Sequence, residues 1–151
     1  MRVDFYHLVK NSLEESVSLL LEKAHSVGNR MLFLVSNEDK AEELADYLWS
    51  YKDESFLPHG TLKDGAKDKH PIFITSDTSV NFNDANILVL GDGVVLPVDD
   101  IKKYERVLNI FDGNSISALD AARGFWKELS LSGEELHYWQ QDIGGAWKEK
   151  K

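Results

Sequence analysis

The sequence predicts an α/β fold: a three-layer α/β/α domain built around a mostly parallel sheet. Short, continuous apolar runs such as "RMLFLV" and "ANILVLG" are typical of strands that are buried on both faces. These runs alternate with longer stretches whose apolar residues recur at helical spacing, as in domains with right-handed strand–helix–strand crossovers. The length of 151 residues suits one domain, which we place at residues 1–151.

The first expected strand covers residues 2–8, which are rich in Val, Phe and Tyr in an alternating pattern. Ser12 and Glu15 have the spacing of a capping box and predict the start of a helix. The inward positions of this helix recur at helical spacing: Leu13, Val17, Leu20, Leu21 and Ala24. Gly28 favours the end of the helix.

A second strand is expected at residues 30–35, followed by a helix capped by either Ser36 or Asn37. The core-facing stripe of this helix is Ala41, Leu44, Ala45 and Leu48. The segment 60–70, "GTLKDGAKDKH", is polar and contains glycine, which is typical of a loop.

Three more buried strands are expected at residues 71–75, 85–91 and 106–111. A last helix should begin between Asn114 and Ser117 and run to about Ser130. Its inward stripe is Ala118, Ala122, Phe125 and Leu129. The segment "LHYWQQD" is expected to form an edge strand, and the residues from about 145 to 151 are expected to be flexible.

The composition excludes several functional classes. Seventeen Lys and Arg against 26 Asp and Glu give a net charge of −9, which argues against strong direct binding of nucleic acid across a broad face. The absence of cysteine excludes disulfides and thiolate metal sites and favours a cytoplasmic location. The longest apolar runs fall short of the about 18 residues of a membrane span, and Asp4 makes the first residues unlike a signal peptide.

No motif in the sequence predicts catalytic residues, metal ligands or a cofactor. The two first strand-to-helix turns lack glycine, and neither GxGxxG nor GxxxxGK[ST] follows a strand. The five histidines lack metal-ligand spacing, and no Gly-x-Ser-x-Gly elbow occurs. A small nucleotide-binding α/β enzyme remains the alternative, and phosphate bound near residues 9–12 or 36–40 would favour it.

Two groups of residues predict binding sites instead. In "LWSYKDESFLPHG", Trp49 and Phe56 flank a charged stretch, and Pro58 biases Leu57 toward an extended backbone. Aromatic side chains presented in this way fit interface anchors, since aromatics dominate the buried centres of interfaces. Closure of the protein's own core under a loop is the other interpretation, and spacing alone leaves both open.

The second group lies on the last helix, where Arg123, Trp126 and Lys127 stand at positions i, i+3 and i+4 and share a face. Two cations beside an indole suit an acidic peptide with an apolar end, because the cations bind carboxylates and the indole packs on an apolar side chain. An ordinary solvated helix face with a partly buried tryptophan is the alternative.

Five segments along the chain are distinctive: "VDFYHL", "LFLVSNEDKAEELADYLWSYKDESFLPHG", "PIFIT", "ANILVLGDG" and "LHYWQQDIGGAWKEK". Through them the chain resembles, over nearly its whole length, the chi subunit of bacterial DNA polymerase III. This resemblance implies a Rossmann-like fold and a non-catalytic accessory subunit of the clamp loader in DNA replication. The implied partners are the psi subunit and the acidic C-terminal tail of the single-stranded-DNA-binding protein; an adaptor for a DNA helicase is an alternative use of the same aromatic site.

The resemblance also assigns residues to the two sites. The psi-binding site would comprise Trp49, Phe56, Leu57, Pro58 and His59. The tail-binding site would comprise Arg123, Trp126, Lys127 and Lys148. Leu119 stands where the family often has another basic residue, one turn earlier on the helix, so the tail site is expected to be weaker or to use Lys148 or Lys150 instead.

Overall fold

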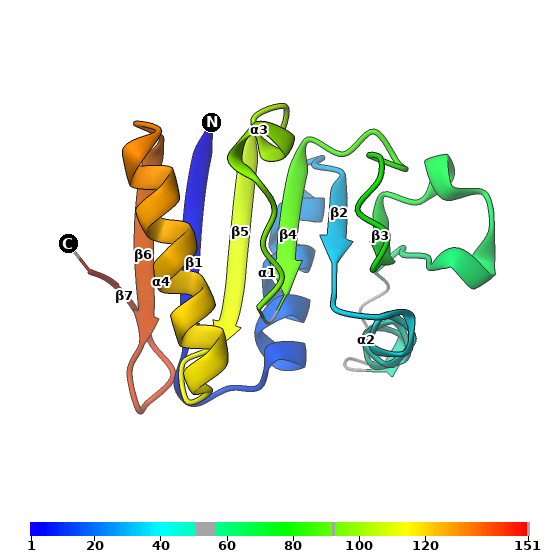
Figure 1. Ribbon diagram of the computed structural model, residues 1–151. Coiled ribbons are helices and arrows are strands. Elements are labelled where there is room, and N and C mark those ends of the chain that lie inside the picture. The colour runs from blue at the N-terminus through cyan, green and yellow to red at the C-terminus, as the bar shows by residue number, and fades with distance from the viewer. Residues whose placement is uncertain (51–56, 92, 151) are drawn as a thin grey trace.

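The computed structural model describes residues 1–50, 57–91 and 93–150, which form a seven-stranded sheet with helices on both faces (Figure 1). The strands are β1 Arg2–Leu8, β2 Met31–Leu34, β3 Ile72–Thr75, β4 Ile87–Gly91, β5 Arg106–Asp112, β6 Glu135–Gln141 and β7 Trp147–Lys150. The helices are α1 Leu13–Ser26, α2 Glu38–Ser50, the single turn α3 Val98–Ile101 and α4 Ile116–Leu131. The predicted loop at 60–70 contains two short 3₁₀ turns, Leu62–Asp64 and Lys67–Lys69.

The strand order is β3-β2-β4-β5-β1-β6-β7, and every neighbouring pair is parallel except β6 and β7. One core cluster joins one face of the sheet to α1 and α2, and a second joins the other face to α4 and the α3 turn. The predicted three-layer α/β fold with a mostly parallel sheet is therefore confirmed.

The apolar stripes read from the sequence are the buried faces of the helices. All four predicted positions of α2 and all four of α4 are buried, as are Leu13, Val17 and Leu21 of α1. Ser12 and Glu15 form the predicted capping box, and the side chain of Asn37 caps α2 by accepting from the amide of Lys40 at 2.8 Å.

One prediction about the sheet is wrong: "LHYWQQD" is not at the edge. β6 lies between β1 and β7, because Trp147–Lys150 folds back antiparallel and adds a further strand outside it. The sequence predicts no element for these last residues, since a short stretch of alternating charges carries little strand signal. Their expected flexibility stays a prediction.

Candidate protein-binding sites

In the turn after β1, where an α/β protein often binds phosphate, a side chain of the protein itself accepts from the backbone amides. The amides of Val9, Lys10 and Asn11 all donate to Oε1 of Gln141, at 3.2, 2.8 and 3.0 Å. Gln141 is buried at the end of β6 and also donates through Nε2 to Asn11 Oδ1. The side-chain oxygen of Gln141 therefore accepts the backbone hydrogen bonds that a phosphate group would need.

The turn after β2 is closed in a similar way. The carboxylate of Glu38 accepts from the hydroxyl of Thr75 at 3.2 Å and from the amide of Ser76 at 2.5 Å. A carboxylate in this position repels a phosphate group. Among residues 1–50, 57–91 and 93–150, moreover, no cluster of three His, Asp or Glu side chains could hold a metal ion.

The first predicted binding group centres on Trp49, the penultimate residue of α2. Its side chain is 55% exposed, while the stripe residue Leu48 before it is buried. The indole lies against the ring of His59, with ring centroids 4.5 Å apart. Trp49 is thus reachable from solvent and packs against a buried ring, which suits an interface anchor.

The neighbouring residues of the same group are placed differently. Leu57 and His59 are only 2% and 5% exposed, and Pro58 is half-buried. Both ring nitrogens of His59 meet backbone carbonyls, Nδ1 that of Leu57 at 2.6 Å and Nε2 that of Ala45 at 3.0 Å. His59 therefore supports the indole of Trp49, Leu57 belongs to the core cluster, and Phe56 lies outside the described residues.

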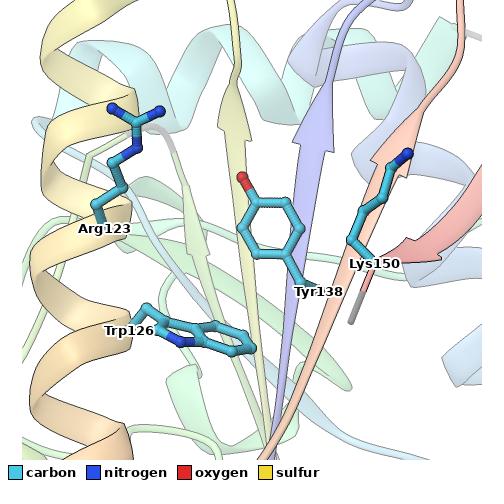
Figure 2. Close-up of a pocket in the computed structure, with 4 residues that line it drawn as sticks. All are labelled: Arg123, Trp126, Tyr138 and Lys150. Atoms are coloured by element: carbon cyan, nitrogen blue, oxygen red, sulfur yellow. The ribbon is translucent and has the colours of Figure 1, made fainter.

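The second predicted group opens onto a pocket of about 390 Å³ between α4 and the last two strands. Among the described residues it is lined by Arg123 and Trp126 of α4, Tyr138 of β6 and Lys150 of β7. Figure 2 shows the ring of Trp126 reaching from the helix toward Tyr138, the side chain of Arg123 rising from the same helix, and Lys150 on the strand beyond Tyr138. We call these four residues the α4 pocket.

The aromatic side of the α4 pocket is fixed by the core beneath it. The ring centroid of Trp126 lies 5.1 Å from that of Phe5 and 5.7 Å from that of Tyr138, both in edge-to-face geometry. The hydroxyl of Tyr138 lies 2.7 Å from Nδ1 of His7, and burial raises the pKa of the phenol. Tyr138 therefore stays neutral at ordinary pH and offers the pocket an aromatic surface held at both ends.

The charges of the α4 pocket are both positive. Arg123 and Lys150 are exposed, and no carboxylate belongs to the lining just described. A chain of net charge −9 thus places two cations around an aromatic patch. Such a site selects a ligand with a carboxylate next to an apolar group.

The other predicted members lie outside the α4 pocket. Lys127 is exposed on α4, and Lys148 of β7 lies 3.9 Å from the carboxylate of Asp142. Leu119 packs on the core below α4. The sequence predicted Lys150 only as an alternative to Lys148 and did not predict Tyr138, although "LHYWQQDIGGAWKEK" is one of the segments that carry the resemblance.

Comparison with known proteins gives one family. The sequence model of the family described as DNA polymerase III chi subunit, HolC, matches residues 1–137. A curated relative named probable DNA polymerase III subunit chi, from Rickettsia prowazekii (strain Madrid E), is 30% identical over 112 residues, which cover 71% of this chain and 67% of the relative.

Proposed function

This chain belongs to the DNA polymerase III chi subunit family, and we propose that it is a non-catalytic accessory subunit of the clamp loader in DNA replication. In this proposal one surface binds the psi subunit, and the other binds the acidic C-terminal tail of the single-stranded-DNA-binding protein. In this proposal the protein works in the cytoplasm. Within the part of the chain that the structure describes, no helix has the length and apolarity needed to cross a membrane.

The α4 pocket is the observation that carries the proposal. A peptide that ends in phenylalanine presents an apolar ring and a free carboxylate on the same residue. The rings of Trp126 and Tyr138 suit the phenylalanine side chain, and Arg123 and Lys150 suit the carboxylate. Acidic residues before the end of the peptide would be attracted by the same cations.

The exposed Trp49 supports a second binding surface for psi. Large aromatics usually lose most of their exposure in a folded chain, yet Trp49 keeps 55% of its own while its neighbours Leu57 and His59 are buried. In the proposed psi-binding site Trp49, Phe56 and Pro58 make contact, His59 supports the indole of Trp49, and Leu57 belongs to the core cluster.

The two surfaces lie toward opposite ends of the sheet. α2, which carries Trp49, packs on β3 at one end of the strand order, whereas the α4 pocket is built over β6 and β7 at the other (Figure 1). Six strand spacings separate the two edge strands, roughly 30 Å. Two partners can therefore bind at once, as a bridging subunit requires.

Each tail contact is expected to be weak, with a dissociation constant of about 1 μM, or roughly −8 kcal/mol. Several tails on one protein-coated DNA strand raise the effective concentration and hold the assembly there without any further contact.

A peptide titration tests this function. Calorimetry with an acidic decapeptide ending in Pro-Phe and a free carboxylate should show binding to the wild type and at least a tenfold loss for Arg123→Glu. Lys102→Glu makes the same charge change on the exposed surface after α3 and should bind like the wild type. Equal affinity for all three proteins would refute the tail site.

A further inference from the structure

β7 has one strand neighbour in the described chain. Trp147–Lys150 pairs antiparallel with β6 and stands last in the strand order. The backbone N–H and C=O groups on the other side of β7 therefore face outward as an open edge. Such an edge is a template for another extended chain.

This open edge is continuous with the α4 pocket. Successive residues of a strand point to opposite faces of the sheet, and Trp147 contacts the ring of Tyr6 at a centroid distance of 5.3 Å on the α1 side. Lys148 and Lys150 therefore point to the α4 side, where Lys150 pairs in register with Tyr138 and lines the pocket. The side chains of Lys148 and Lys150 thus lie along β7 on the same face as the α4 pocket.

We propose that an acidic peptide whose C-terminal end occupies the α4 pocket continues along β7 and pairs with its outer edge as an eighth strand. The inference rests on the function proposed for the pocket and adds how the upstream part of the peptide is held. Main-chain hydrogen bonds to β7 bind the extended peptide whatever its sequence, and Lys148 and Lys150 select acidic side chains.

The charges on β7 favour such a peptide over a second copy of the chain. Two copies paired through β7 around a two-fold axis normal to the sheet would keep the same face upward. Lys148 and Lys150 of one copy would then face the same lysines of the other, and like charges directly opposite each other are destabilising. Lysine on an edge strand is a common device against this self-pairing.

The test compares two peptides with the same free Pro-Phe end: an acidic hexapeptide that reaches only the α4 pocket and an acidic dodecapeptide that extends along β7. The wild type should bind the dodecapeptide about tenfold tighter than the hexapeptide, since several added hydrogen bonds and charge contacts contribute. Equal affinities overturn the strand pairing while leaving the pocket intact. Failure of both peptides to bind overturns the function proposed for the pocket and this inference with it.

N-methylation separates backbone pairing from charge attraction and leaves the protein unchanged. Alternate amides of a paired strand point toward its neighbour. Two dodecapeptides are therefore made, each N-methylated at alternate upstream residues in one of the two possible sets. One set should lose the length-dependent gain and the other should keep it, whereas equal effects of the two sets overturn the proposal.

A variant of the edge gives an independent result. Lys148→Glu should weaken binding of the dodecapeptide several-fold more than binding of the hexapeptide, while Lys23→Glu, an equal charge change on exposed α1, should alter neither. Sedimentation of the free protein should show a monomer. A dimer whose formation protects the amides of Trp147–Lys150 from hydrogen exchange would mean that β7 pairs with a second copy, and would overturn the inference.

Discussion

The exposed indole of Trp49 rests on the buried imidazole of His59, with ring centroids 4.5 Å apart and ring planes inclined by 48°. The histidine is in turn fixed to the backbone of two segments, since its ring nitrogens meet the carbonyls of Ala45 and Leu57. The exposed ring of Trp49 can therefore contact a partner, while the buried ring of His59 supports it. We expect Trp49 to matter mainly for binding and His59 mainly for stability.

Trp49→Ala should abolish co-purification with the psi subunit and leave the fold intact. More than half of the side chain is exposed, so its loss should change the free energy of unfolding by only about 0.5 kcal/mol. Urea denaturation and a pull-down on the same preparation measure both effects. A large loss of stability would show that Trp49 is mainly a core residue.

His59→Ala should do the reverse and destabilise the protein. Removing the ring takes away a buried side chain and its contacts to the carbonyls of Ala45 and Leu57, and the cavity and the lost hydrogen bond should together cost about 1–3 kcal/mol. The urea midpoint should fall at an unchanged slope. Since Trp49 loses its support, psi binding should weaken but persist. A variant that keeps its full stability but loses all psi binding would show that His59 acts in binding and not in stability.

Lys127→Glu should weaken tail-peptide binding less than Arg123→Glu does. Lys127 lies next to the α4 pocket and attracts an acidic peptide only at long range, whereas Arg123 lines it. The Lys127 effect should also shrink faster as salt rises from 50 to 500 mM, because exposed charges farther apart are screened first (Debye length about 10 Å at 0.1 M). Titrations of both variants at the two salt concentrations measure this, and equal losses at both would contradict it.

The sequence predicted the helices and their buried faces because helical periodicity is local. Ala118, Ala122, Phe125 and Leu129 are buried as expected, and Arg123 and Trp126 face the pocket together. Tyr138 and Lys150 could not be assigned in the same way. Their positions depend on β6 pairing with β1 and on the register of β7, which are contacts between segments far apart in the chain.

The same limit applies to the segment after α2. Leu57, Pro58 and His59 follow no helical or strand period, so the sequence could not say which of them point inward. Leu57 and His59 are buried there because both pack against α2, where His59 meets the carbonyl of Ala45. The role of Gln141 was equally hidden, since it joins the end of β6 to a turn about 130 residues earlier.

Gln141→Ala should destabilise the protein more than its place at the end of a strand suggests. Its Oε1 accepts from the amides of Val9, Lys10 and Asn11, and no alanine atom can replace it. Donors left unpaired in a partly buried turn should lower the free energy of unfolding by about 1–3 kcal/mol. Gln140→Ala, on the more exposed neighbour, is the matched control for the urea denaturation, and equal midpoints for the two variants would contradict the assignment.

The attachment of β7 to β6 should weaken as pH rises above the ordinary histidine pKa of about 6.5. Nδ1 of His137 lies 2.5 Å from a carboxylate oxygen of Glu149, and Nε2 lies 2.8 Å from one of Glu135. The hydrogen bonds to Glu149 and then to Glu135 raise the pKa of His137, against small opposing effects of burial and of Arg2. The pair of carboxylates therefore favours the charged ring.

A raised folded-state pKa means that this stabilisation is fully present below the unfolded value of about 6.5 and is lost as pH rises through the folded value. Amide hydrogen exchange of Trp147–Lys150 should thus show more protection at pH 6 than at pH 8.5, after correction for the intrinsic pH dependence of exchange. Glu149→Gln, which removes the largest cause of the raised pKa, should flatten this change. Protection that is independent of pH in the wild type, or that rises with pH, would show that His137 does not hold β7 through its charge.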